Sequence, residues 1–362
     1  MIRKKINQAK KLVSDWVAFR ELNSYDPPTS QNNLLVNFEN PQLYHRFFYL
    51  LLKFYKISGY NIYYPLSFSK FRNLRNKDQY LALIVREKNF LSVNKNKLPD
   101  QFIEINDQMF SADYFSHYFE QNNRVSDAFH IPMSFHPLMY HKEIWNMKVK
   151  TDRKRLNSVF CYGNFDQKAY SEIEKTDFKV IPRTELLSFF KEKQQFLSIN
   201  SREEIIEGNS DLNEKFTFAI KENFQIEMRE IRELLSYFNF YLCCPGVVMP
   251  LCHNVVEAMS VGTIPLIEKE YAEVMYPHLE NNVNAIIFEG LENLEKIVSE
   301  EIFNLPEDEI IKMRQNALAY YNEFLSPINV VTAANQNIKE KNTIYLQAEH
   351  RSIRFKDYRF YV

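Results

Sequence analysis

The sequence predicts an α/β protein built from two Rossmann-like domains with doubly wound parallel sheets. Short apolar runs that suit buried strands alternate with amphipathic segments that suit helices. The length of 362 residues fits two domains of ordinary size. Only six glycines occur, and several of them stand where a predicted strand or helix ends.

Composition excludes several classes of protein. The formal net charge is −1 and hydrophobic residues make up 45% of the chain, so nothing requires nucleic acid as a partner. The longest apolar run, Phe47 to Leu52, is far shorter than the ~20 residues that cross a bilayer. Four cysteines without ligand-like spacing or a signal peptide indicate reduced thiols. We therefore expect a cytoplasmic protein without a metal site.

Residues 1–23 predict a basic amphipathic helix. Apolar side chains recur at helical spacing, and Lys and Arg occupy the other faces. Such a helix either docks on its own domain or makes peripheral contact with the anionic surface of the inner membrane.

The first domain, residues 1–150, is predicted to begin as β-α-β-β and to hold the acceptor side. The predicted strands are 34–38, 60–64 and 80–85. A helix follows the first of them, with Asn40 as N-cap, Pro41 at its first position and Gly59 just after its end. The charged run 148–155 breaks the apolar periodicity, and we place the domain boundary there.

The second domain, residues 151–325, alternates strand and helix. Strands are predicted at 158–162, 178–181, 216–220, 240–244, 263–267 and 284–288, and helices at 168–175, 226–237, 255–261 and 306–324. This alternation is typical of a parallel sheet. The tail, residues 326–362, turns basic and aromatic, and we expect it to pack back across both domains.

Candidate ligand-binding residues gather at predicted carboxyl ends of strands in the second domain, where open parallel sheets bind ligands. Glu257, near the start of a helix, either accepts the hydroxyls of a ribose or only favours the positive end of its helix. His253 lies one turn earlier on the same face. Arg183 suits a diphosphate because its planar donors grip two oxygens, although a solvated surface arginine is the alternative. The remaining candidates on this edge are Gly163, Asn164, Pro245, Gly246 and Asn254.

The pattern His253-x-x-x-Glu257-Ala258-x-x-x-Gly262-x-Ile264-Pro265 resembles the nucleotide-sugar site of GT-B glycosyltransferases, and most closely that of the exostosin-like branch. In that branch an arginine stands near the position of His253. Retaining families carry a further glutamate eight residues before the second, where this chain has Met249, and this difference favours an inverting reaction. The resemblance covers residues 158 to 324. It implies two Rossmann-like domains that face each other across a cleft, with the donor in the C-terminal half and no cofactor or obligatory metal.

An inverting transfer needs a general base for the acceptor hydroxyl. The resemblance implies that the base comes from the N-terminal domain. Glu39, directly after the first strand, and His136 rank first, ahead of Asp113, His117 and His130.

Together these features predict a hexosyl- or related transferase that uses a nucleotide-sugar donor. We expect a UDP- or GDP-linked donor ahead of a CMP-linked one, and a glycan or lipid-linked glycan as acceptor. The bias toward Asn, Lys, Phe and Tyr is typical of an AT-rich bacterial genome and favours synthesis of a surface polysaccharide or lipooligosaccharide. The alternatives are a catalytically silent nucleotide-binding relative and a transferase for CMP-linked Kdo or sialic acid. No Gly-x-Gly-x-x-Gly run supports a dehydrogenase.

Overall fold

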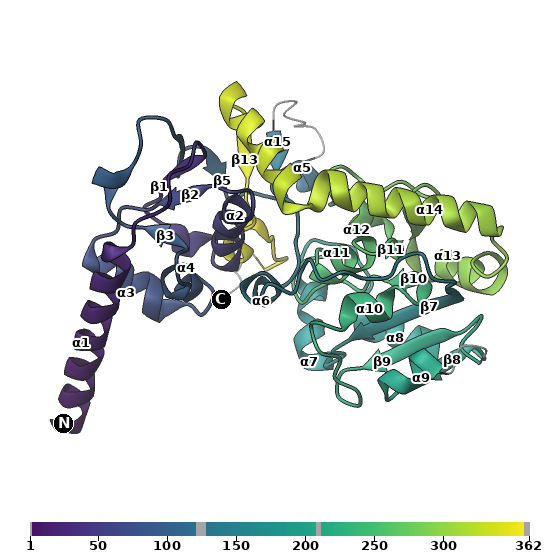
Figure 1. Cartoon of the computed structure of the whole chain (residues 1–362). Coiled ribbons are helices and arrows are strands. Elements are labelled where there is room, and N and C mark those ends of the chain that lie inside the picture. The colour runs from purple at the N-terminus through teal and green to yellow at the C-terminus, as the bar shows by residue number, and fades with distance from the viewer. Residues whose placement is uncertain (1, 121–127, 208–210, 358–362) are drawn as a thin grey trace. The chain divides into compact units, whose positions relative to one another are not determined.

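The computed structural model describes residues 2–120, 128–207 and 211–357, which form two compact α/β units (Figure 1). Unit 1 contains the described residues up to His117, residues 128–131 and Pro327–Ser352. Unit 2 contains residues 118–120, Pro132–Ser326 and the described residues from Ile353 onward. Both units carry parallel sheets, which confirms the predicted α/β class.

Unit 1 is built on a four-stranded parallel sheet in the order β3-β2-β1-β4. Its strands are β1 (Asn33–Asn37), β2 (Asn61–Tyr63), β3 (Leu91–Ser92) and β4 (Ile103–Asn106). Its first helices are α1 (Ile2–Ser24), α2 (Arg46–Ile57), α3 (Phe68–Lys77) and α4 (Leu81–Arg86). The strand order reverses between β1 and β4, so their carboxyl ends form a topological switch point.

Two predictions in unit 1 are corrected by local hydrogen bonds and backbone geometry. The run 80–85 is not a strand, because Asp78 Oδ1 accepts the N–H groups of Tyr80 and Leu81 at 2.9 and 2.8 Å and starts helix α4. The predicted helix 41–57 is interrupted. Pro41–Leu43 forms a 3₁₀ turn, and α2 begins only after His45, which has a φ of 45°.

The C-terminal segment supplies residues to both units. In unit 1, β13 (Thr343–Tyr345) is the central strand of a second parallel sheet in the order β5-β13-β6. The other elements there are β5 (Phe110–Ser111), β6 (Ala128–His130), α15 (Pro327–Glu340) and α16 (Glu349–Ser352). In unit 2, Phe355 forms an isolated antiparallel bridge with Thr176. Residues 358–362 of the predicted tail lie outside the described residues.

Unit 2 is built on a six-stranded parallel sheet in the order β12-β11-β10-β7-β9-β8. The strands are β7 (Leu156–Gly163), β8 (Phe196–Ser198), β9 (Phe216–Ile220), β10 (Phe238–Leu242), β11 (Ile264–Glu268) and β12 (Ile286–Phe288). Compared with the Rossmann order, the second and third strands have exchanged places. The order reverses between β7 and β10, which makes their carboxyl ends the switch point of this unit.

Helices complete unit 2 around a core rich in Phe, Leu and Ile. They include α6 (Pro137–His141), α7 (Gln167–Tyr170), α8 (Arg183–Lys191), α9 (Arg202–Glu207), α10 (Ile231–Leu235), α11 (His253–Met259), α12 (Lys269–Glu273), α13 (Gly290–Lys296) and α14 (Glu307–Tyr320). Five of the six predicted strands of this unit appear within two residues of their expected ends. The sixth, 178–181, is irregular because the N–H groups of Lys179 and Ile181 bond to the carboxylates of Glu270 and Glu268 instead of a neighbouring strand.

The charged run 148–155, where the sequence suggested a boundary, lies inside unit 2. Arg155 accounts for this placement because its buried guanidinium is bonded to the core of the unit. Nη1 donates to the carbonyls of Phe238 and Gly262, each at 3.1 Å, and to Thr263 Oγ1 at 2.9 Å. The observed division instead falls between Ile131 and Pro132.

Candidate functional site

The switch point of unit 2 brings together residues that are far apart in the sequence. β7 ends at Gly163, and β10 is followed by a Pro/Gly loop that leads into α11 (Figure 1). Because β7 and β10 are neighbours, the segments that follow them meet at one edge of the sheet. Hydrogen bonds and close approaches link six predicted donor-site residues there. They are Gly163, Asn164, Arg183, Pro245, Asn254 and, within the loop, Gly246.

Arg183 ties the two strand-end segments together. It is the first residue of α8 and is 6% exposed, so it is not the solvated surface arginine that the sequence left open. Nε donates to the carbonyl of Pro245 at 3.0 Å, and Nη1 donates to the carbonyl of Asn164 at 3.1 Å. The guanidinium carbon also lies 3.8 Å from the ring centroid of Tyr170. The planar donors that the sequence assigned to a diphosphate therefore hold backbone carbonyls, and Arg183 positions the loop.

Gly163 and Gly246 stand where a side chain would come close to neighbouring atoms. A Cβ on Gly246 would lie 2.8 Å from the carbonyl oxygen of Met249, closer than such atoms approach. The N–H of Gly246 donates to that same oxygen at 2.9 Å, which closes the loop on itself. A Cβ on Gly163 would lie 3.2 Å from Nη1 of Arg183. The loop geometry therefore depends on glycine at position 246, whereas a Cβ at position 163 would require only a small shift of the Arg183 side chain.

Asn254 and Tyr271 fix the other end of the loop. Asn254 is buried, and its Nδ2 donates to the carbonyl of Cys244 at 2.9 Å. The Tyr271 hydroxyl accepts the N–H of Cys252 at 2.7 Å and lies 3.2 Å from Asn254 Oδ1. Sequence reasoning did not single out Tyr271, because it comes from α12, beyond the next strand. Only the parallel pairing of β10 with β11 brings it to this edge.

Glu257 carries a buried carboxyl group on α11. The residue is 8% exposed, and among the described residues no hydrogen bond or ion pair engages its carboxylate. Burial raises the pKa of Glu257 from 4.5 to about 7, although the nearby His253 and Arg232 act in the opposite direction. Its carboxylate oxygens are not among the fully buried unpaired atoms of the described residues, so they keep some access to solvent, and this position suits a ligand that supplies hydroxyl donors.

His136 and His253 lie side by side within unit 2. Their ring centroids are 5.9 Å apart in an edge-to-face arrangement. His136 caps α6, and its Nδ1 accepts the N–H of Leu138 at 3.3 Å. When the ring is neutral, this bond places the proton on Nε2, which then donates rather than accepts. The sequence assigned His136 to the N-terminal domain as a base, whereas its position beside His253 suits a donor to a ligand.

Cys252 stands directly before His253, with its Sγ 3.8 Å from the imidazole Nδ1. Burial alone would raise the pKa of the Cys252 thiol, but the neighbouring His253 and Arg183 outweigh it and lower the pKa to about 5. All four cysteines are free thiols, as the composition predicted.

Glu39 lies at the switch point of unit 1. It follows β1, and its N–H donates to Asp107 Oδ2 at 2.6 Å. Because Asp107 follows β4, this bond joins the ends of the two strands between which the strand order reverses. The side chain of Glu39 itself is exposed.

A histidine–aspartate pair in the same unit was not anticipated from the sequence. His45 Nδ1 lies 3.4 Å from Asp78 Oδ2, and the side chains are 32% and 21% exposed. A carboxylate on Nδ1 fixes the proton there and leaves Nε2 as the basic nitrogen. His45 also has φ 45° and ψ −123°, a strained backbone of the kind that collects at functional sites. The two residues are 33 positions apart, and the sequence pattern had placed His45 inside a continuous helix.

Of the remaining base candidates, His117 and His130 pack against aromatic rings in unit 1, and Asp113 is exposed. The rings of His117 and His130 have centroids 5.2 Å apart, and His130 stacks on Tyr345 at 4.7 Å. Asp113 lies in a turn where its N–H donates to Ser111 Oγ. Within the described ranges, no group of three or more His, Cys, Asp or Glu side chains is arranged to hold a metal ion. In the same part of the chain, no helix has the length and apolar character of a membrane span.

Comparison with known proteins gives structural similarities at low sequence identity. No family model matches the chain, and no curated protein is a significant match. A glycosyltransferase from Rickettsia africae ESF-5 is 12% identical, covers 88% of this chain and 99% of its own, and has a TM-score of 0.37. Anabaena HepE in complex with UDP and glucose is 10% identical over 85% and 99% of the chains, with a TM-score of 0.33. Glycosyltransferase SnogD from Streptomyces nogalater is 9% identical over 87% and 100%, with a TM-score of 0.30. Because none of these TM-scores reaches 0.5, the proposal below is built on the residues of the two units.

Proposed function

We propose that this chain is an inverting glycosyltransferase of the GT-B type that moves a sugar from a UDP- or GDP-linked donor to a hydroxyl of a glycan or lipid-linked glycan. The observation that carries the proposal is the switch point of unit 2. There a glycine-dependent loop, a buried carboxyl group and two adjacent imidazoles occupy the edge where open parallel sheets bind nucleotides.

Different side chains bind different parts of the donor. The Glu257 carboxyl accepts the ribose hydroxyls, which supply the hydrogen bonds that it lacks within the described residues. His253 and the Nε2–H of His136 donate to the diphosphate and offset the charge that develops on the leaving group. The backbone around Gly163 and Gly246 approaches the ligand closely because neither position carries a side chain. The reaction in this proposal uses no metal ion.

The general base in this proposal is His45, held by Asp78, with Glu39 as the competing candidate. Both His45 and Glu39 follow β1 in unit 1, the half from which the GT-B resemblance implies that the base comes. Asp78 fixes the His45 tautomer, so that Nε2 can take the proton of the acceptor hydroxyl while the hydroxyl oxygen attacks the anomeric carbon.

Substitution of the base should separate binding from chemistry. We expect His45→Asn to lower the rate of sugar transfer, or of donor hydrolysis, by about 10²–10⁴-fold while nucleotide affinity stays unchanged. Asp78→Asn should lower the rate less and should move the pH profile, because it acts through the imidazole. The assay follows release of nucleoside diphosphate from UDP- and GDP-sugars, with Asp113→Asn as the control variant. Full activity in His45→Asn together with loss of rate in Glu39→Gln would reassign the base to Glu39.

The same assay distinguishes the alternatives. Nucleotide binding without release of product from any donor, in the presence of mixed glycan acceptors, identifies a catalytically silent protein. Turnover confined to CMP-linked Kdo or sialic acid identifies the transferase for acidic sugars. Turnover of a UDP- or GDP-linked sugar supports the function proposed here.

A further inference from the structure

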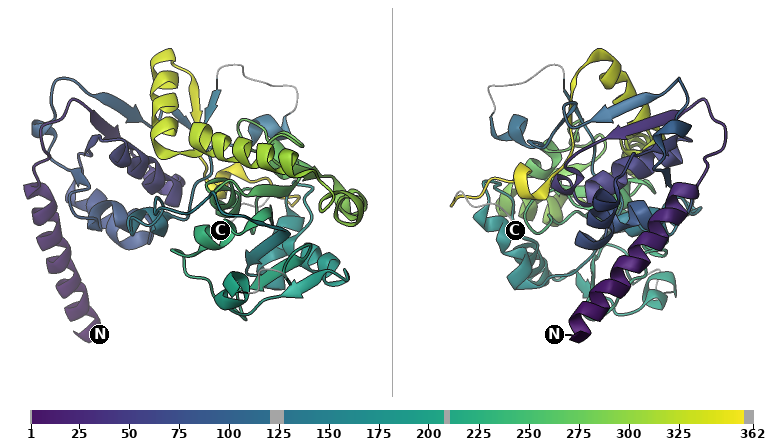
Figure 2. Two further views of the ribbon diagram at one scale, coloured as in Figure 1. Left: turned by 45° about the vertical axis from the view of Figure 1, so that its right-hand side comes forward. Right: turned by 90° about the vertical axis from the view of Figure 1, so that its left-hand side faces the viewer.

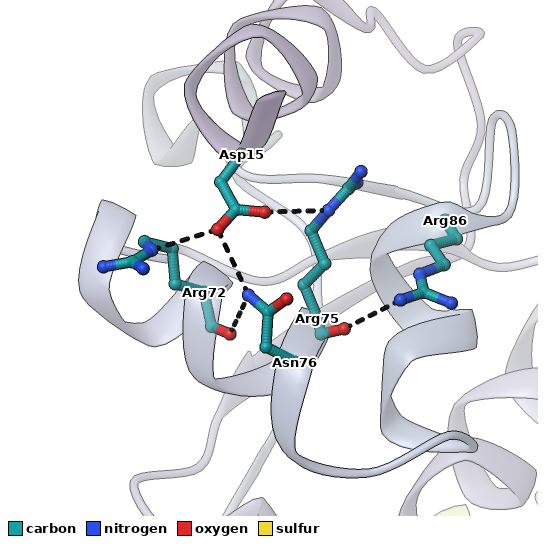
Figure 3. A network of polar contacts seen from close by, with 5 residues as sticks. All are labelled: Asp15, Arg72, Arg75, Asn76 and Arg86. Carbon is teal, nitrogen blue, oxygen red and sulfur yellow. Dashed lines mark hydrogen bonds and ion pairs between the residues drawn. The ribbon is translucent and has the colours of Figure 1, made fainter. Parts of the chain in front are cut away.

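Helix α1 is anchored to unit 1 by one buried carboxylate. The side chain of Asp15 is 2% exposed (Figure 3). Its Oδ2 accepts from Arg72 Nε at 3.1 Å and from Asn76 Nδ2 at 3.2 Å, and its Oδ1 pairs with Arg75 Nε at 3.1 Å. All three partners come from α3. Two cations on one carboxylate fix the rotation of α1 about its own axis.

Aromatic packing supports the same orientation. Phe19 is one helical turn beyond Asp15 and therefore lies on the same face. Its ring centroid is 5.6 Å from that of Phe68 and 5.2 Å from that of Phe71. The C-terminal half of α1 is thus held against α3 by an ion pair and a ring cluster (Figure 1).

The opposite face of α1 carries an apolar stripe that nothing within the described residues covers. We use the name "outer stripe" for Ile6, Val13 and Val17, which are 48%, 63% and 50% exposed. Leu12 and Trp16, at 44% and 49% exposure, lie nearer the docked face, where the Trp16 ring contacts Phe68 with centroids 5.1 Å apart. Residues 3–14 are all exposed. The purple helix runs away from the sheet of unit 1 toward its N-terminal end (Figure 2). Because the ion pairs of Asp15 fix the rotation of α1, the helix cannot turn to bury the outer stripe while it stays docked on α3.

Positive charge surrounds the outer stripe. Helix α1 contains six basic residues and two acidic ones in a chain whose net charge is −1. One of the acids is Asp15, which is already paired with two arginines. At about 100° per residue, Arg20 and Lys10 border the stripe on its two sides, and Lys5 lies farther round on the side of Arg20. An apolar stripe flanked by exposed Lys and Arg matches the boundary between anionic head groups and acyl chains.

We propose that α1 lies in the surface of an anionic lipid membrane, with the outer stripe among the acyl chains and the flanking basic residues on the head groups. A second copy of this chain is a poorer occupant, because pairing two outer stripes would bring the basic residues of both helices together. Trp16 packs on Phe68 beside the stripe and is 49% exposed, and its amphipathic ring suits the membrane interface.

The test is sedimentation of the full chain with phosphatidylcholine vesicles that contain or lack phosphatidylglycerol. We expect binding to vesicles with the anionic lipid and weak binding without it. Val13→Glu with Val17→Glu should abolish binding, whereas Ile311→Glu, at an apolar residue of α14 that is 42% exposed, should leave it unchanged. Lys5→Ala with Lys10→Ala should weaken binding about 25-fold, since each lysine near an anionic surface contributes roughly a fivefold gain in affinity. Lys191→Ala with Lys312→Ala is the matched charge control.

Thermal melting keeps the outcome interpretable, because the substituted residues are exposed and the variants should melt like the wild type. Equal binding by the wild type and the Val13/Val17 variant would overturn the proposal. So would a concentration-dependent dimer, measured by analytical ultracentrifugation, that Val13→Glu dissociates while vesicles bind neither protein. That result would assign the outer stripe to a second copy.

Discussion

Glu257 combines burial with the absence of a hydrogen bond to its carboxyl group among the described residues. The carboxyl lies on α11 with 8% exposure and has no hydrogen bond within the described part of the chain. The sequence pattern placed it at the edge of a sheet but offered two interpretations, a ribose contact or a charge at the end of a helix. The burial of Glu257 supports our proposal of a ribose contact, because a residue that only favours the helix end would remain solvated.

The pH dependence of stability tests this environment. Because the folded-state pKa of about 7 exceeds the ordinary 4.5, the folded protein holds a proton that the unfolded chain releases between these values. The free energy of unfolding should therefore fall as pH rises from 4.5 to 7. The stabilising contribution is complete below 4.5 and lost above 7. Between pH 4.5 and 7, the free energy of unfolding of Glu257→Gln should rise by about 3 kcal/mol relative to that of the wild type.

Urea unfolding of both proteins at several pH values measures the effect. Glu268 has a similarly raised pKa, again because of burial, and contributes to the slope of both proteins alike. The difference between wild type and variant therefore isolates Glu257. A difference that stays constant with pH would show that the carboxyl is not held in a desolvated position.

At the scale of elements, the switch-point loop depends on Arg183. Its guanidinium bonds to carbonyls that follow β7 and β10, and no other residue type spans these groups with planar donors. We expect Arg183→Met to lower the free energy of unfolding by about 2–4 kcal/mol, because buried carbonyls lose charged donors. Nucleotide affinity should fall as well, since the loop loses its anchor.

Arg229→Met is the control for this variant, because the Arg229 side chain is 61% exposed and pairs only with the exposed Glu227. Chemical denaturation measures stability, and titration with nucleoside diphosphates measures affinity. If both variants matched the wild type in stability and affinity, Arg183 would not position the loop.

The elements show which features could be predicted from sequence and which could not. Strand β9 appears where the apolar run predicted it, at Phe216–Ile220, because a central strand buried on both faces needs a continuous apolar segment. Run 80–85 has equally apolar residues but forms a helix, since the Asp78 cap decides between the two structures. Run 178–181 does not form the predicted strand for a different reason. Its N–H groups donate to carboxylates from α12 and from the end of β11. Contacts between distant segments cannot be read from local periodicity.

At the scale of the whole molecule, two parallel sheets each have a switch point, and candidate residues follow strands at both. The meeting of Asn164, Arg183 and Pro245 at one sheet edge could be predicted, because topology alone sends strand ends to a common edge. His136 was assigned to the wrong half, since its position beside His253 depends on a chain crossing near Ile131 that composition does not mark. The pair of His45 and Asp78 was missed because only the fold joins two residues that flank separate helices.

The central claim is that the switch point of unit 2 binds a nucleotide diphosphate through Glu257. Its most direct test is the shift in melting temperature of the full chain on addition of UDP, GDP, CMP and dTDP species. We expect UDP or GDP to raise the melting temperature, Glu257→Ala to abolish the rise, and Glu39→Ala to keep it. No shift with any nucleotide, or an unchanged shift in Glu257→Ala, would contradict the account.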